Sequence, residues 1–157
     1  MAAATAPNIY VQLISSTIGC IGFSLWFKIK GRQVAYSGLG AFLTWLIYLV
    51  AYHYTENVFS AVLIASIFVA AFAQVMARIN KAPATIFRTS AVFPLIPGSK
   101  LYYMMYFTVM RKPHEALDNA WRLIVVCVAI ALGFIVVEII SKYLAILQRR
   151  IGNKNLG

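Results

Sequence analysis

Two prolines and a glycine interrupt an apolar stretch in the second half of the chain, in Phe93-Pro-Leu-Ile-Pro-Gly-Ser-Lys100. Proline lacks an amide hydrogen and clashes with the preceding helical turn, so a helix that enters this segment should stop near Ile96. Ser99 is a favourable N-cap, which predicts that a second helix starts there. The sequence therefore predicts a span over residues 83–110 that is broken near residue 97.

The start of the second half-helix is a candidate binding site for a carboxylate. The first amides of a helix lack intrahelical partners, and the helix dipole places positive charge beside them. The candidate substrate-binding residues of the break are Pro94, Pro97, Gly98, Ser99 and Lys100. The alternative interpretation is a proline kink that only shapes helix packing.

Glu138 is the one carboxylate deep inside an apolar run, in Phe134-Ile-Val-Val-Glu-Ile-Ile140. Charges inside a membrane are costly and often mark proton pathways, so Glu138 is the candidate for proton coupling. The alternative is local, because Lys142 lies four residues further on and is well placed for a helical ion pair.

Several polar residues in or near apolar runs are further candidates. Gln74 and Arg78 share one face at a spacing of four residues, and they are candidates for the inner mouth of a transport path. Arg88 is a further candidate for binding an anionic substrate. Tyr102 and Tyr103 either line the same site or belong to an aromatic belt at the membrane surface. The alternative interpretation of Arg78 and Arg88 is that their side chains only extend to the inner surface of the membrane.

The elements that position these residues follow from composition. Hydrophobic residues make up 62% of the 157 residues and charged residues 11%, whereas soluble domains are about a quarter charged. We therefore predict an all-α integral membrane protein that forms a single transmembrane domain over residues 1–157. A span needs roughly 20 apolar residues. The expected spans are 9–27, 34–52, 58–77, the broken segment 83–110, and 121–144.

The charge distribution predicts the orientation of these five spans. With the N-terminus outside, eight lysines and arginines fall in the inner loops 28–32 and 78–81 and in the C-terminal tail, against two in the outer loop 111–118. A re-entrant hairpin over 83–110 is the alternative, and it weakens this bias. The net charge of +10 is thus typical of a membrane protein in contact with lipids, and nucleic acid is not an expected partner. No basic residue precedes the first apolar run, so the first span is not expected to be a cleaved signal peptide.

Signatures of enzymes and metal sites are missing from the sequence. There is no HExxH, no GxSxG and no glycine-rich phosphate loop, and His53 and His114 lie in different loops. Four acidic residues spread along the chain do not form a metal-binding pattern. Cys20 and Cys127 lie in apolar runs and are expected to pack there. We expect no enzymatic activity, no cofactor and no metal.

Four short motifs carry a resemblance to a known family. They are Ala77-Arg78, Lys81-Ala-Pro-Ala-Thr-Ile-Phe87, Phe93-Pro-Leu-Ile-Pro-Gly98 and Leu101-Tyr-Tyr-Met104. Together they resemble the C-terminal membrane half of the threonine/serine exporter family, which in many bacteria is a separate small subunit. The resemblance implies a larger partner subunit, a location in the bacterial cytoplasmic (inner) membrane, and export driven by the proton gradient. It implies threonine and serine as substrates, or succinate-like acids in some two-subunit members.

Two other functions remain open from the sequence. A structural subunit would stabilise the partner without transporting anything itself. A homo-oligomeric channel would carry flux that does not respond to the proton gradient.

Overall fold

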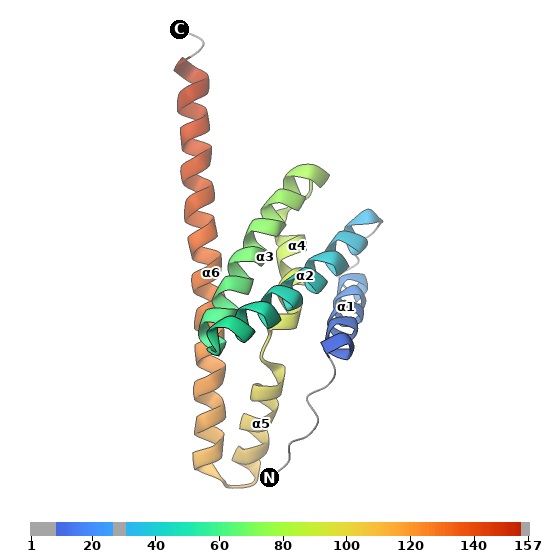
Figure 1. Ribbon diagram of the computed structural model, residues 1–157, viewed down its shortest axis with the longest axis vertical. Helices are drawn as coiled ribbons and strands as arrows, with labels where there is room; N and C mark the ends of the chain where they lie inside the picture. The colour runs from blue at the N-terminus through green and yellow to red at the C-terminus, as the bar shows by residue number, and fades with distance from the viewer. Residues whose placement is uncertain (1–8, 27–30, 155–157) are drawn as a thin grey trace.

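The computed structural model describes residues 9–26 and 31–154, and all secondary structure in these ranges is helical. The helices are α1 (Ile9–Trp26), α2 (Arg32–Thr55), α3 (Val58–Asn80), α4 (Ala84–Val92), the 3-10 helix η1 (Phe93–Leu95), α5 (Gly98–Val109) and α6 (Pro113–Lys154) (Figure 1). Lys28 and Lys30 of the predicted inner loop lie outside the described residues.

Four helices of the described chain are long and apolar enough to cross a membrane: Ile9–Trp26, Gln33–Thr55, Val58–Asn80 and Pro113–Leu144. They include the four uninterrupted spans expected from the sequence. The predicted all-α membrane protein is therefore confirmed.

The turn between α2 and α3 is capped at both helix ends. Glu56 adopts a left-handed conformation (φ 51°), and its backbone amide donates a hydrogen bond to the Tyr52 carbonyl. The Asn57 side chain accepts a hydrogen bond of 2.9 Å from the Phe59 amide at the start of α3. These caps explain why two long apolar helices can be joined by only two residues.

The last helix differs from the prediction. An outer loop was expected over 111–118, but α6 already begins at Pro113, where proline is well tolerated because the first amides of a helix need no partner. The helix then continues without interruption to Lys154. Its 42 residues correspond to about 63 Å, roughly twice the thickness of a bilayer's hydrocarbon core. Both polar ends of α6 are therefore helical.

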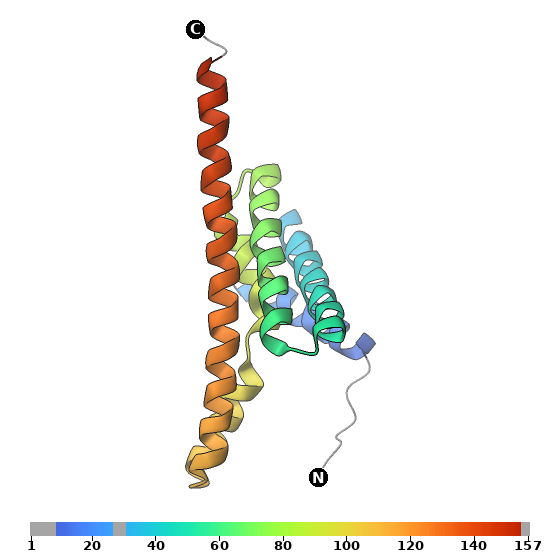
Figure 2. The same cartoon turned by 60° about the vertical axis from the view of Figure 1, so that its left-hand side comes forward.

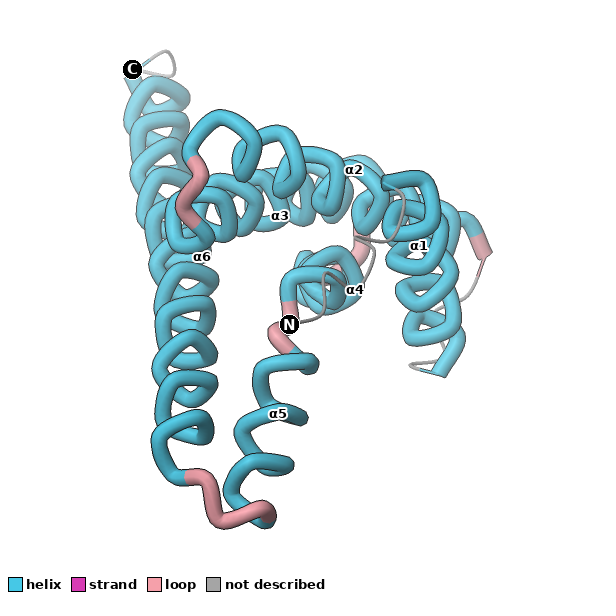
Figure 3. Tube along the Cα trace, turned by 60° about the horizontal axis from the view of Figure 1, so that its bottom comes forward, coloured by secondary structure: helices cyan, strands magenta, loops and turns pink. Residues whose placement is uncertain are grey.

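An arc of α6, α3, α2 and α1 surrounds α4 on one side (Figure 3). Within the arc α3 and α6 run parallel, since Val62 packs near Val126 and Gln74 hydrogen-bonds to Ser141 further along both helices. The backbone of α4 packs on α3 and α2 and makes few close approaches to α6. Side chains fill the space between α4 and α6.

A hydrophobic cluster occupies that space. It consists of buried Ala65, Val69, Ala91 and Leu95, against which Ile130 and Phe134 of α6 pack. On the other side of α4, the Cys20 Sγ lies 2.9 Å from the Ser90 carbonyl oxygen, which ties α1 to α4. Cys20 thus packs as expected, whereas Cys127 is exposed.

The segment 84–109 runs in one direction. From α4 the chain passes through η1 and a short extended stretch into α5, which continues away from α4 along the N-terminal part of α6 (Figures 1 and 2). This course does not fold back, as a re-entrant hairpin would.

Candidate functional site

The helix that enters the break ends earlier than predicted. The α-helical part of α4 ends at Val92, and a 3-10 turn carries the chain to Leu95, so that Pro94 lies within this turn. Ile96 is extended (φ −65°, ψ 122°), and Pro97 occupies the N-cap position of α5. The predicted interruption near residue 97 thus separates two helices of the structure.

The predicted role of Ser99 as N-cap is wrong. Ser99 is the second residue of α5, and no side chain caps this helix. The Gly98 amide donates to the Ile96 carbonyl (2.8 Å), and the Lys100 and Leu101 amides both donate to the Pro97 carbonyl (3.1 and 3.2 Å). Because these amides already donate within the turn, the helix N-terminus has fewer free amide donors for an anion than the sequence suggested.

A pocket of about 590 Å³ lies beside the break. Its wall combines two helix–helix junctions with the break itself, namely Trp45, Tyr48 and Tyr52 of α2, Val58 and Val62 of α3, residues 94–97, Ser99 and Lys100, and Trp121, Arg122, Val125 and Val126 of α6. Four predicted residues therefore come together here: Pro94, Pro97, Ser99 and Lys100. The volume is in the usual range for small-molecule sites.

The other four predicted substrate-binding residues do not line this pocket. A Cβ added to Gly98 would meet nothing within 4 Å, so no close contact requires glycine there. Tyr102 and Tyr103 are exposed, and Tyr102 stacks on Tyr106 with ring centroids 6.3 Å apart. Arg88 lies further up α4 and pairs with Glu138.

The aromatic wall of the pocket was not predicted from the sequence. Trp45, Tyr48 and Tyr52 lie on one face of α2, at spacings of three and four residues that were visible in the sequence. The ring centroids of Trp45 and Tyr48 are 4.9 Å apart. The indole Nε1 of Trp45 is buried and has no hydrogen-bond partner within the described part of the chain. A buried donor without a partner is costly, so Trp45 Nε1 would gain a hydrogen bond from a ligand that reached it.

Two cationic side chains line the same pocket. Arg122 donates to the Asp118 carboxylate at 3.1 Å, one turn earlier on α6. Lys100 forms no ion pair with any described residue. The pocket therefore combines an uncompensated positive charge, a hydroxyl, an indole donor and aromatic walls, which suits a small solute that carries a carboxylate.

Glu138 pairs with a residue on another helix, and its predicted local partner Lys142 is not the one used. Both terminal nitrogens of Arg88 lie 3.4 Å from Glu138 Oε2. The Arg88 guanidinium also lies over the Phe134 ring, with Cζ 5.3 Å from the centroid. The structure thus brings together the anion-binding candidate Arg88 and the proton-coupling candidate Glu138.

Gln74 and Arg78 do not act together in the structure. Gln74 accepts a short hydrogen bond from Ser141 across the α3–α6 contact. Arg78 is exposed near the end of α3 and has no ion pair among the described residues.

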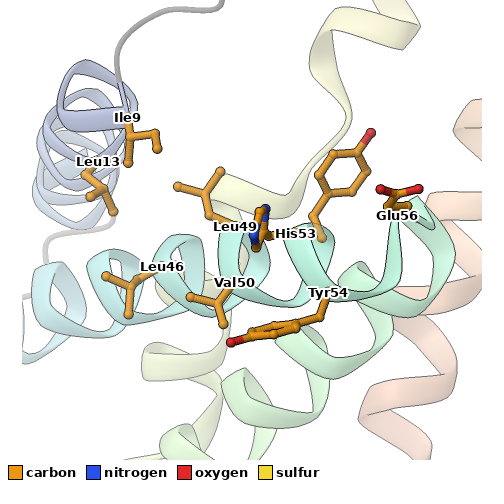
Figure 4. A pocket seen from close by; sticks show the side chains of 9 residues that line it. Ile9, Leu13, Leu46, Leu49, Val50, His53, Tyr54 and Glu56 are labelled. Atoms are coloured by element: carbon orange, nitrogen blue, oxygen red, sulfur yellow. The ribbon is translucent and has the colours of Figure 1, made fainter.

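A second pocket, of about 770 Å³, lies between α1 and α2 (Figure 4). Ile9, Leu13, Leu46, Leu49 and Val50 line it, and His53 and Glu56 lie towards one end. No residue predicted to bind substrate lines this pocket, and its mostly apolar wall suits a hydrocarbon chain better than a charged solute. No group of three or more His, Cys, Asp or Glu side chains in the described ranges is arranged to hold a metal ion.

Comparison with known proteins gives one positive finding. A family model described as threonine/serine exporter, ThrE, matches residues 12–140, which is most of the chain and includes the break, the pocket and the Arg88–Glu138 pair. No curated protein and no solved structure matches the chain.

Proposed function

The chain belongs to the threonine/serine exporter family, and we propose that it is the membrane subunit of a two-component exporter of small hydroxy amino acids. The second component is a larger subunit of the same family. The proton gradient across the bacterial cytoplasmic membrane drives the export of threonine and serine. This role is transport and involves no enzymatic reaction.

The pocket beside the break carries this proposal. Lys100 supplies a charge for the solute carboxylate, and Ser99 and Trp45 Nε1 supply neutral donors beside it. The aromatic side chains of Tyr48, Tyr52 and Trp45 suit the apolar part and the ammonium group of a small amino acid. Pro97 matters because it stands between the two helices, at the N-cap position of α5, and forms part of the pocket wall.

The proposed orientation puts the pocket on the outer side of the membrane. With the N-terminus outside, the α2–α3 turn faces outward, and the pocket is lined by Tyr52 and Val58 beside that turn. Arg88 and Glu138 then lie towards the inner side, where α4 begins. A solute leaving the cell passes the ion pair first and the pocket last.

The partial exposure of the Arg88–Glu138 pair supports a partner subunit. The side chain of Glu138 is 47% exposed and that of Arg88 23% exposed, on a surface that otherwise carries Ile135, Val136 and Ile139. Charges that face hydrocarbon are costly. We infer that the larger subunit, or water enclosed by it, covers this side of α4 and α6.

Export of labelled threonine and succinate from cells lacking the endogenous system tests the proposal. Three strains are compared, which express this chain alone, the larger subunit alone, or both together. Each strain is assayed with and without an uncoupler. We expect export of threonine only from the pair, and only with the gradient intact. A complex that forms but moves neither solute would contradict the proposal and favour a purely structural subunit. Gradient-independent flux by this chain alone would favour a homo-oligomeric channel.

Succinate-like dicarboxylates are the second candidate substrate. The pocket has two cationic residues, Lys100 and Arg122, which would suit two carboxylates. In the same assay, faster export of succinate than of threonine would favour this candidate.

A further inference from the structure

Each partner of the Arg88–Glu138 pair has a polar atom that forms no hydrogen bond with a described residue. Both terminal nitrogens of Arg88 share one oxygen, Oε2, at 3.4 Å, and no described residue bonds to the other oxygen of Glu138. Arg88 Nε is buried without a partner. A well-made arginine–carboxylate pair uses two oxygens at about 2.7–2.9 Å. The pair is therefore loose and unsaturated.

The ion pair and the outer pocket lie on opposite sides of the hydrophobic cluster. The pocket ends at Val126 on α6 and the ion pair is at Glu138, twelve residues or about 18 Å further along the helix. Ile130 and Phe134 of α6, which pack against the cluster, lie between them, and Leu95 of the cluster borders the pocket. Arg88 and Glu138 thus form a separate polar site on the inner side of an apolar plug.

Glu138 is the only acid in this part of the molecule. The other acidic residues are Glu56 in the α2–α3 turn and Glu115 and Asp118 at the start of α6. The other ionisable groups near Glu138 on the elements packed here are three basic side chains and one phenol: Arg88 from α4, Arg78 from α3, and Lys142 and Tyr143 on α6 itself. Gln74 of α3 is neutral and bonds to Ser141. A proton or a cationic group that enters this site has Glu138 as its acceptor.

We propose that Arg88 and Glu138 separate to bind the zwitterion of an α-amino acid, and that a proton competes with this solute for Glu138. The solute carboxylate replaces Glu138 on Arg88, including its unpartnered Nε, and the solute ammonium group binds the released Glu138 carboxylate. This inference rests on the proposed export function and specifies its substrate class and its coupling.

The charges balance through a cycle without any covalent step. A neutral zwitterion leaves the site outward, and Glu138 then takes one proton from water on the outer side. A protonated Glu138 no longer attracts an ammonium group, so proton and solute exclude each other. Release of the proton inward completes the exchange of one solute for one proton. Succinate has no ammonium group, and its second carboxylate would face Glu138 with the same charge.

Exchange of labelled threonine in vesicles that contain the exporter with both subunits tests the proposal. We expect the KM for threonine to rise by up to about tenfold per unit of falling pH, the limit for one competing proton, while the maximal rate stays constant. Serine should compete, and succinate and threonine methyl ester should not. A KM that does not change with pH, or competition by succinate equal to that by serine, would overturn the proposal.

Variants of Glu138 give a second measurement. In Glu138→Gln the KM should rise at least about tenfold and lose its dependence on pH, whereas Glu138→Asp should keep that dependence. Glu115→Gln is the matched control and should behave as the wild type. It removes a carboxylate that lies on the same helix as Glu138 and forms an exposed pair with Lys112 of the α5–α6 turn. Retention of the wild-type pH dependence in Glu138→Gln would refute the coupling role alone. Absence of threonine flux in the wild type would instead refute the proposed export function as well. If Glu138→Gln does not accumulate, the pH dependence of the wild-type KM alone tests the competition between proton and solute.

Discussion

Ser66 and Gly133 meet where α3 packs on α6, so closely that a Cβ added to Gly133 would collide with Ser66 Oγ and lie 2.9 Å from Ser66 Cβ. The Ser66 hydroxyl lies 2.8 Å from the Leu63 carbonyl oxygen of its own helix and 3.3 Å from that of Ala129 on α6. This close contact of small residues fixes the distance between the two helices on which the pocket and the ion pair depend.

Gly133→Ala should therefore destabilise the protein. The added methyl group must push α3 and α6 apart, at a cost of about 1–3 kcal/mol. Thermal unfolding in detergent should report this loss as a lower midpoint. Gly98→Ala is the control, because its Cβ would point into open space, and its midpoint should not fall. Equal midpoints for the two variants would contradict the close contact.

Lys100→Gln should weaken binding of the solute at the pocket beside the break. Loss of a charge-assisted hydrogen bond is worth about 1.5–3 kcal/mol, which corresponds to an increase of about ten- to a hundredfold in KM. Transport kinetics at matched protein levels measure the effect. Lys112→Gln removes an exposed lysine from the α5–α6 turn and should leave KM unchanged. If both substitutions have the same effect, general surface charge and not the pocket is responsible.

Trp45→Phe separates the ligand contact from packing. Phenylalanine keeps a ring in the pocket wall but removes the buried, unpartnered Nε1 hydrogen. We expect stability to be maintained and the KM for the solute to rise about two- to tenfold, because a neutral hydrogen bond contributes about 0.5–1.5 kcal/mol. An unchanged KM would show that the indole does not contact the solute.

Replacing both prolines tests whether the break is a site or only a kink. In Pro94→Ala/Pro97→Ala the backbone regains two amide donors, and the helix can extend through residues 93–98. We expect the complex to form in normal yield but to lose transport, since Ser99 and Lys100 would rotate out of the pocket. Reduced yield with normal transport per complex would instead favour the kink.

Removing one partner of the Arg88–Glu138 pair should cost more stability than removing both. A single Arg88→Gln leaves the Glu138 charge without a partner, at a cost of about 1–2 kcal/mol for this half-exposed pair. Arg88→Gln/Glu138→Gln should recover most of that loss while transport remains defective. A double-mutant cycle on the unfolding midpoints measures the coupling between the two side chains. Additive effects would show that the pair contributes no interaction energy.

The sequence predicted the helices well because apolar length and proline chemistry act locally. Four spans and the interruption before residue 98 follow from such local patterns. The start of α6 at Pro113 was missed because polarity indicated a loop, although polar residues form helix readily outside a membrane. The N-cap was misplaced because the Pro97 carbonyl already accepts the Lys100 and Leu101 amides, which propensity alone does not reveal.

The pairing of Arg88 with Glu138 could not be predicted from spacing. Within α6, Lys142 is the obvious partner. Only the packing of α4 and α6 against α3 brings together two residues that are 50 positions apart. The aromatic wall was visible as a helical pattern in α2, but its position opposite the break depends on the same packing. Patterns within one helix are readable in a sequence, whereas contacts between helices follow from the whole bundle.

The uninterrupted α6 and the broken segment 84–109 hold the two candidate sites in different ways. The single helix α6 carries the pocket residues between Trp121 and Val126 and also the ion-pair residue Glu138. It packs closely on α3 at Gly133. By contrast, α4 and α5 are joined only by the extended link at Ile96 and Pro97. That link joins two segments with different neighbours, since α4 packs on α3 and α2 whereas α5 packs on α6.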